Sequence, residues 1–269
     1  MNQKKLFHIC TISNDAVQYE KMKASFLKVG FHQDYCTYTL YDNTLENKFD
    51  PYQTFNAIQN LFEERYIIFC HQDVVLDQGN NFADLVQRLA ALELIDSSWA
   101  ICGNAGVNYH YQYVVRISDP ANSPNWKGGF PQLVISLDEN FLVVKSTSNI
   151  KCSAALKGFH FYGSDLCLQA IRNGYSCYAI DFHLSHLSRG TFNESYWEIK
   201  SAFYNRWCRQ FKFSYFKTMT GQIMCFSSND KIRRIASIYL VRKLLFLVNW
   251  IYPFLPPIKA KAYLSASAE

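Results

Sequence analysis

Two side chains able to bind a cation follow the most apolar short run of the sequence. The run Tyr66–Cys70 leads directly into His71-Gln72-Asp73, so His71 and Asp73 are separated by one residue at the end of an expected buried strand. A nitrogen and a carboxylate ligand on the same side of a strand end suit a divalent cation held against a diphosphate. The alternative is that Asp73 only caps a turn. The pattern predicts a site for Mn²⁺ or Mg²⁺ at Asp73.

A second aspartate stands where an amphipathic helix is expected to begin. Asp165 lies within residues 159–170, at the first turn of that helix, where the helix dipole favours a negative charge. A carboxylate fixed there could take a proton from an attacking hydroxyl group. An N-cap aspartate without chemistry is the alternative for this segment alone.

Two histidines lie in a third polar segment, residues 182–190. His183 and His186, together with Ser185 and Arg189, follow an expected strand and could complete a metal or phosphate site. The sequence leaves open which histidine is functional.

The elements that position these residues alternate between strands and helices. Such alternation predicts an α/β fold with an open, mostly parallel sheet and helices on both faces, which binds ligands at the carboxyl ends of its strands. Residues 103–132 are rich in Gly, Asn and Pro and predict an irregular, mobile loop region. The expected strands are 6–12, 35–41, 66–70, 99–102 and 178–181, with 132–137 and 141–145 as a strand pair or one bent strand; the expected helices run to about 28 and over 51–65, 82–95, 165–173 and 194–211.

These segments, in this order, resemble the GT-A glycosyltransferases of the family-2 type. More narrowly, they look like the branch related to streptomycin-biosynthesis proteins, in which the usual Asp-x-Asp is written His-Gln-Asp. The resemblance covers roughly residues 5–210 and is most specific in 68–74, 159–170 and 186–190. Two departures stand out: His71 replaces the first Asp of Asp-x-Asp, and Ser164 replaces an acidic residue before Asp165.

The resemblance implies a nucleoside-diphosphate sugar donor and an inverting transfer to a hydroxyl of a glycan or lipid-linked acceptor, in surface polysaccharide synthesis. It assigns Asp165 as the catalytic base and Asp73 and His186 as metal ligands. It assigns donor binding to Ile12, Ser13, Asn14, Asp42, Asn56, His71 and Asp138.

Two other functions compete with this interpretation. The two departures favour a non-catalytic scaffold or glycan-binding subunit with the same fold. A nucleotidyltransferase would share the fold, but it usually has a Gly-rich, basic phosphate loop near the first strand, and residues 12–17 contain neither feature.

The charge of the chain is divided unevenly along its length. Residues 1–198 contain 15 Lys and Arg against 20 Asp and Glu, whereas residues 199–269 contain 12 against 2, which together give the net charge of +5. Basic residues interleaved with aliphatic and aromatic runs over 231–253 predict a helix lying on an anionic membrane surface rather than one that binds nucleic acid. A core or dimer-interface helix is the alternative. We therefore expect a catalytic domain over 1–212 and a helical membrane-surface or interface segment over 213–269.

The cysteines and the start of the chain indicate the compartment. The nine cysteines lie mostly in apolar runs, where Cys behaves as a small buried hydrophobe, and they show no C-x-x-C spacing. The first residues lack the long apolar stretch of a signal peptide. These features predict a cytoplasmic protein, peripheral on the inner face of the membrane.

Overall fold

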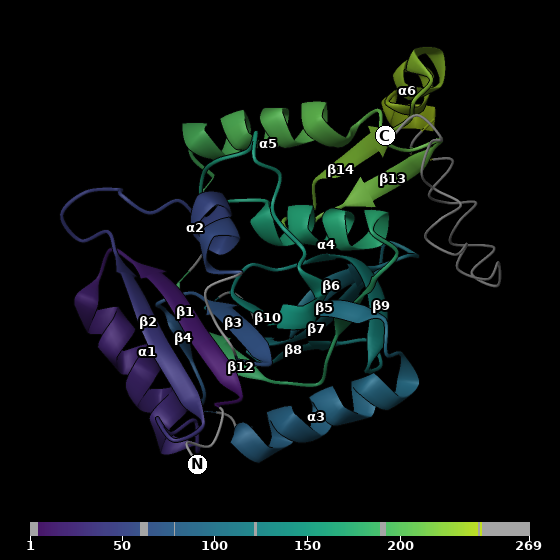
Figure 1. The fold of residues 1–269 in the computed structure, drawn as a ribbon. Coiled ribbons are helices and arrows are strands. Elements are labelled where there is room, and N and C mark those ends of the chain that lie inside the picture. Colours follow the sequence, from purple (N-terminus) through teal and green to yellow (C-terminus); the bar gives the residue numbers. More distant parts are fainter. Residues whose placement is uncertain are drawn as a thin grey trace.

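The central sheet is built around a strand whose residues are all apolar and buried, β3 (Tyr66–Cys70). The computed structural model describes residues 5–59, 64–77, 79–120, 123–188, 192–241 and 243. Strands β1 (Phe7–Ser13) and β2 (Cys36–Asp42) pair in parallel beside β3, with Ser13 opposite Asp42. The carboxyl ends of these three strands therefore meet at one edge of the sheet (Figure 1).

The described part of the sheet contains twelve strands in the order β2-β1-β3-β10-β5-β11-β9-β6-β7-β12-β4, with β8 paired to β7. Strands β10, β9, β7 and β12 run opposite to β1, and the others share its direction. The predicted α/β fold with a mostly parallel sheet between helices is confirmed. The remaining bounds are β4 (Val74–Val75), β5 (Trp99–Gly103), β6 (Ala105–Asn108), β7 (Tyr113–Ser118), β8 (Asn125–Lys127), β9 (Gln132–Leu137), β10 (Phe141–Lys145), β11 (Ser176–Ala179) and β12 (Leu184–His186).

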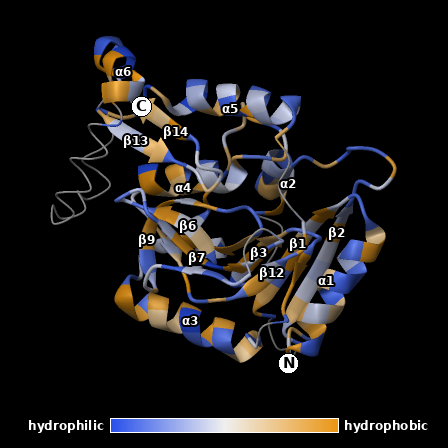
Figure 2. Ribbon diagram, turned by 180° about the vertical axis from the view of Figure 1, so that it is seen from behind, coloured by the Kyte–Doolittle hydropathy of each residue, from blue (hydrophilic) through white to orange (hydrophobic). Residues whose placement is uncertain are grey.

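Alternating side chains of the strands form two separate cores, one on each face of the sheet. In β3, Ile67 and Phe69 face one core while Ile68 and Cys70 face the other. The helices α1 (Ala16–Lys28) and α3 (Phe82–Ile95) cover the face of Ile68. The opposite face is covered by α2 (Pro51–Ile58), α4 (Tyr162–Arg172) and α5 (Glu194–Trp207). Figure 2 shows apolar strands between helices whose polar residues face outward.

Two sequence-based expectations are wrong. Residues 103–132 are not an irregular region, because β6, β7 and β8 form there and pair with one another and with β9 and β12. Strands β9 and β10 are not partners: β9 pairs with β6 and β11, whereas β10 pairs with β3 and β5. Strand pairing between distant segments decided both cases, and local turn residues do not reveal it.

The chain continues after α5 into a hairpin, β13 (Ser214–Lys217) and β14 (Ile223–Phe226), and a short helix α6 (Asp230–Ala236). Phe216 and Phe226 of the hairpin pack into the core on the α4 face. Much of the predicted membrane-surface helix, residues 242 and 244–253, lies outside the described residues, so the division at residue 212 stays a prediction. Within the described part of the chain, no helix combines the length and apolarity needed to cross a bilayer.

The nine cysteines are all free and buried, as expected from their apolar surroundings.

Candidate functional site

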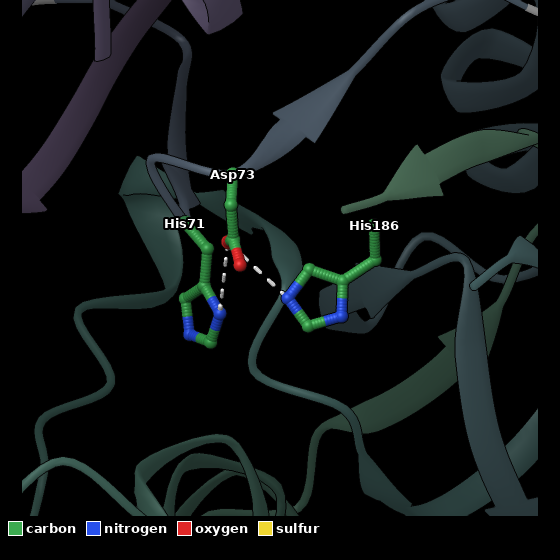
Figure 3. Close-up of side chains that lie close together, drawn as sticks. All are labelled: His71, Asp73 and His186. Atoms are coloured by element: carbon green, nitrogen blue, oxygen red, sulfur yellow. Dashed lines mark ion pairs between the residues drawn. The ribbon is translucent and has the colours of Figure 1, made fainter. Parts of the chain in front are cut away.

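Three predicted residues converge where β3, β4 and β12 meet. His71 and Asp73 lie in the loop after β3, and His186 ends β12, whose pairing places it opposite Val74. Their ligand atoms all lie within 4.8 Å of one another. Oδ1 of Asp73 is 4.0 Å from Nδ1 of His71 and 3.2 Å from Nε2 of His186, and Figure 3 shows the carboxylate between the two rings. This group is called the His71–Asp73–His186 cluster below.

The other ring nitrogen of His71 is engaged by a buried tyrosine. Nε2 of His71 lies 2.9 Å from the hydroxyl of Tyr162, and that hydroxyl donates to the carbonyl of Glu139 at 3.2 Å. Because Tyr162 has one hydroxyl hydrogen, its oxygen accepts from an N–H at Nε2 of His71. Burial, followed by the nearby charge of His186, lowers the pKa of His71, so its ring is held neutral. The lone pair of Nδ1 therefore faces Asp73.

His186 presents a buried nitrogen without a hydrogen-bond partner among the described residues. Its Nε2 is close to Asp73, but the approach does not have hydrogen-bond geometry. Burial lowers the pKa of His186, but the bonding and charge of Asp73 outweigh it and leave that pKa raised. Burial likewise raises the pKa of Asp73, and the two histidines outweigh it and hold the pKa well below its usual value. The 3.2 Å distance and the opposite pKa shifts of the two groups indicate that Asp73 attracts His186 electrostatically, although His186 Nε2 makes no hydrogen bond among the described residues.

The cluster fits a divalent cation. Nδ1 of His71 and Nε2 of His186 converge with one carboxylate oxygen, and an unpaired buried nitrogen is the feature that a metal ion would satisfy. Imidazole is a common ligand of transition-metal ions, whereas Mg²⁺ prefers oxygen ligands. The donor set therefore favours a transition-metal ion over Mg²⁺.

Ser13 and Asn14, predicted to bind the sugar-nucleotide donor, are joined through Gln72 to the loop after β3 that carries His71 and Asp73. Its amide oxygen accepts from Ser13 Oγ and from the backbone N–H groups of Asn14 and Asp15, at 2.9 and 3.1 Å for the last two. Its amide nitrogen donates to Asn14 Oδ1 at 2.7 Å. Gln72 thus fixes the loop after β1 against the loop after β3. Gln72 was not among the predicted site residues, although its position between His71 and Asp73 is a signal in the sequence.

The other residues predicted to bind the sugar-nucleotide donor differ in the solvent exposure of their side chains. Asp42 is exposed beside Ser13 at the end of β2, where its Oδ1 accepts from Thr44 N–H. Ile12 is partly buried against the core on the α4 face. The side chain of Asn56 is clamped to Cys152, because its amide donates to the Cys152 carbonyl at 2.9 Å and accepts from the Cys152 N–H at 2.7 Å. In this position Asn56 holds a loop.

Asp165, the predicted base, lies in the first turn of α4, and its side chain is fully buried. Its oxygens accept three hydrogen bonds, from Ser153 N–H at 2.7 Å, Ser153 Oγ at 2.8 Å and Trp207 Nε1 at 2.7 Å. Burial raises its pKa in spite of these donors. The carboxylate ties α4 to α5 and to the loop before α4.

Asp138 and Glu139 lie between the cluster and a cavity. Asp138 is half-buried, its Oδ1 accepts from the Asn140 N–H, and its charge favours the protonated forms of His71 and His186, although burial leaves the pKa of His71 lowered. Glu139 is half-buried and lines the cavity beside α4; burial, followed by the charge of Asp138, raises its pKa to about 8. Glu139 was predicted only as an alternative base, together with Asp138, should Asp165 not be the base.

The backbone at the start of α4 lies close to the Glu139 side chain. Phe161, the N-cap, has φ of 66°, an uncommon conformation for a non-glycine residue, and the backbone N–H groups of Gly163 and Phe161 act to lower the pKa of Glu139 against the effect of burial. A Cβ atom at Gly163 would lie 3.3 Å from Glu139 Cγ and 3.0 Å from the Leu137 carbonyl. The glycine therefore permits this close approach.

The structure separates the two candidate histidines. His183 lies away from the cluster, where its Nε2 is 3.1 Å from Ser118 Oγ and the Trp126 ring packs edge-on against it. His186 is the one that joins Asp73. Arg189 and Gly190 lie outside the described residues.

Comparison with known proteins gives one clear sequence relative. Over 225 residues the chain is 33% identical to the protein named "ATP synthase subunits region ORF 6" from Fuscovulum blasticum, which corresponds to 81% of this chain and 90% of that protein. No protein-family model matches the chain.

The chain is also similar to several solved structures. These include A197 from STIV (TM-score 0.43, 13% identity, 68% of this chain and 86% of that one) and S. aureus TarS in complex with UDP-GlcNAc (0.48, 11%, 72% and 64%). A third is the mannosyltransferase PcManGT from Pyrobaculum calidifontis in complex with GDP-Man and Mn²⁺ (0.47, 9%, 74% and 61%). At these scores and identities the likenesses identify no activity for this chain.

Proposed function

Since the chain belongs to the family of the Fuscovulum blasticum protein "ATP synthase subunits region ORF 6", a name that states no activity, we propose its function from the site itself. The protein is a glycosyltransferase of the GT-A type that transfers a sugar from a nucleoside-diphosphate sugar to a hydroxyl group. The observation that carries the proposal is the position of Glu139, whose side chain lines a hollow beside α4 and whose carbonyl is joined through Tyr162 to the His71–Asp73–His186 cluster.

The donor is held at the edge of the sheet where β1, β2 and β3 end. His71, Asp73 and His186 would hold a divalent cation, and such a cation would supply positive charge to the leaving diphosphate. The exposed Asp42 carboxylate at the end of β2 receives the ribose or base, next to the loop that Gln72 orders. This arrangement follows the general placement of ligands at the carboxyl ends of strands.

The transfer needs one base. The acceptor oxygen attacks the anomeric carbon, the bond from that carbon to the diphosphate oxygen breaks with its electron pair leaving on the diphosphate, and the hydroxyl proton passes to Glu139. A base on the side opposite the leaving group gives inversion. A base works best when its pKa lies near the working pH, which the raised pKa of Glu139 satisfies.

Asp165 remains the rival base from the sequence analysis. To act, it would have to leave Ser153 and Trp207 and reach the cavity, whereas Glu139 already lines it. We therefore assign the base to Glu139.

The proposed setting is surface polysaccharide synthesis on the cytoplasmic face of a membrane. A patch on α6 and the residues after it supports membrane contact: apolar side chains that are 44–74% exposed stand beside basic Lys231 and Arg234. The apolar members of this α6 patch are Ile232, Ile235, Ile238, Tyr239 and Leu240. Exposed apolar groups next to cations suit an anionic lipid surface.

The membrane contact can be tested by flotation of the full chain with vesicles that contain anionic lipid. Replacing Ile232 and Ile235 with Ser should reduce the bound fraction. The matched control replaces Leu94 and Ile95 of α3, which are 90% and 61% exposed, with Ser. This variant should bind the vesicles as the parent does. Equal binding by both double variants would refute the role of the α6 patch.

The activity is tested by a screen of UDP- and GDP-sugars with and without Mn²⁺. Thermal shift reports binding, since a ligand that binds only the folded state stabilises it by mass action. Release of nucleoside diphosphate reports turnover. Binding without release for every donor and acceptor would favour the non-catalytic scaffold, and no binding to any nucleotide would refute the proposal.

A further inference from the structure

Two lysines meet at one tyrosine ring beside the turn of the β13–β14 hairpin. Lys217 ends β13, and its Nζ lies 3.8 Å from the centroid of the Tyr113 ring on β7. Lys127 ends β8, and its Nζ lies 5.9 Å from the same centroid. Three strands therefore bring two ammonium groups to one place, which is called the Lys127–Lys217 pair below.

No acidic side chain neutralises the charge of this pair. Among the residues that the structure describes, neither lysine forms an ion pair with Asp or Glu. The ammonium of Lys217 donates to the Tyr111 carbonyl at 2.9 Å, which uses one of its three N–H groups. Lys217 is half-buried, and burial, followed by the charge of Lys127, lowers its pKa. Both effects disfavour the charged form, and an anion in contact with both ammonium groups would offset them.

The number and type of these cations favour a phosphate group over a carboxylate. Lys binds phosphate as a point charge. A phosphate monoester carries about −1.5 to −2 charges at pH 7 and three acceptor oxygens, so it can bond to two ammonium groups at once. Lys127 is exposed and has a flexible four-carbon stem, so its ammonium can move toward an anion beside Lys217.

The Lys127–Lys217 pair lies near the proposed base. Ser136 Oγ donates to the carbonyl of Lys217 at 2.8 Å, and Ser136 precedes Glu139 by three residues. Three residues of extended chain span about 10 Å. Thr218, the residue after Lys217, lines the hollow beside Glu139. An acceptor whose hydroxyl lies at Glu139 could therefore reach the pair with a phosphate group that it carries.

We infer that the Lys127–Lys217 pair binds a phosphate group and that this phosphate belongs to the acceptor. The inference rests on the proposed glycosyl transfer and specifies its acceptor as a compound with both a hydroxyl and a phosphate. The two lysines position the acceptor and take no part in the proton transfer.

Anion binding is tested first on the metal-free full chain, so that a cation at the His71–Asp73–His186 cluster cannot hold the probe. Phenyl phosphate, inorganic phosphate and benzoate are titrated calorimetrically at low salt, where charges are least screened. We expect both phosphates to bind and benzoate not to bind. Lys127→Gln and Lys217→Gln should each weaken the binding of phenyl phosphate about tenfold. The exposed Lys127 carries the test if Lys217→Gln does not fold.

A lysine on α1 provides the matched control. Nζ of Lys23 lies 5.9 and 5.8 Å from the ring centroids of Tyr19 and Tyr38, so Lys23→Gln also removes a cation beside tyrosine rings. This variant should bind phenyl phosphate as the parent does.

The role of the phosphate in the acceptor is tested with Mn²⁺ and the donor found in the screen. The acceptors are a hexose 1-phosphate and the methyl hexoside of the same sugar, which differ in the anion. We expect the hexose 1-phosphate to have the lower KM and inorganic phosphate to compete with it. Lys127→Gln should raise that KM about tenfold and leave the KM of the methyl hexoside and the donor affinity unchanged. Lys127→Arg, which keeps the charge, should largely restore it.

Several results would overturn the inference. These are benzoate binding as tight as that of phenyl phosphate, phenyl phosphate affinity unchanged in both lysine variants, and weaker donor binding in Lys127→Gln. Phosphate binding at the pair without a preference for the hexose 1-phosphate would assign the pair to free phosphate and overturn its role in acceptor binding. Absence of donor binding would instead refute the glycosyl transfer, while the titration with phenyl phosphate would still test the pair.

Discussion

The hydroxyl of Tyr162 lies 2.9 Å from Nε2 of His71 and 3.2 Å from the carbonyl of Glu139, so one buried side chain joins the cluster to the proposed base. Residues that hold the second nitrogen of a ligating histidine fix its tautomer and orientation. Tyr162 would therefore orient His71 toward a cation bound at the cluster without contacting that cation.

Removing that hydroxyl should weaken the cation site without unfolding the protein. Tyr162→Phe keeps the ring that packs edge-on against Phe69 and leaves Nε2 of His71 without its acceptor. We expect Mn²⁺ affinity to fall about 10- to 100-fold, as for other outer partners of metal-bound histidines. Isothermal titration with Mn²⁺ measures this, and an affinity equal to that of the parent would show that the bond does not orient His71.

His186, at the end of β12, and His183, just before β12, provide a test variant and a matched control for cation binding. His186→Asn removes the nitrogen beside Asp73 and should abolish measurable Mn²⁺ binding, whereas His183→Asn changes a ring bonded to Ser118 and should leave Mn²⁺ binding intact. The change in melting temperature on adding Mn²⁺ measures cation binding by each variant. A Mn²⁺-dependent shift that survives in His186→Asn and disappears in His183→Asn would reverse the assignment.

Gln72 should support the donor site through the loop after β1. Gln72→Leu leaves the N–H groups of Asn14 and Asp15 without their acceptor, and each lost hydrogen bond costs about 0.5–1.5 kcal/mol. We expect weaker nucleotide binding and a nearly unchanged Mn²⁺ affinity, because Asp73 keeps its backbone bond to Leu187. Equal nucleotide affinity in parent and variant would show that the loop needs no such support.

Much of this arrangement could be predicted from the sequence, because it depends on local patterns. The continuous apolar run before His71 identified both β3 and the edge at which ligands bind, and the helix of residues 82–95 was predicted with its observed bounds. The functions of Asp165 and Glu139 could not be separated in this way. A carboxylate in the first turn of a helix has the same sequence signature whether it faces a cavity or a set of buried donors. Asp165 faces the buried donors of Ser153 and Trp207.

Variants of the two carboxylates should fail in different ways. Asp165→Asn places an NH₂ group against the donors of Ser153 or Trp207, and an unsatisfied buried polar group costs about 1–3 kcal/mol. We expect a melting temperature lower by several degrees with residual turnover. Glu139→Gln keeps the shape of a half-buried side chain and removes its basicity, so it should melt like the parent while kcat falls about 100-fold or more. The reverse pattern would assign the base to Asp165.

The pH dependence of the transfer should report Glu139. Burial, followed by the negative charge of Asp138, raises its pKa to about 8, and only the ionised form accepts a proton. Below that pKa, kcat/KM should rise about tenfold per pH unit and then level off, with the bend at or below pH 8 because a cation at the cluster also favours the ionised form. Asp138→Asn removes a negative charge and retains the oxygen that accepts from Asn140, so the bend should move to lower pH. The measurement is kcat/KM for the best donor between pH 5 and 9 in parent and variant. A bend that stays in place, or moves to higher pH, would show that Glu139 does not limit the rate.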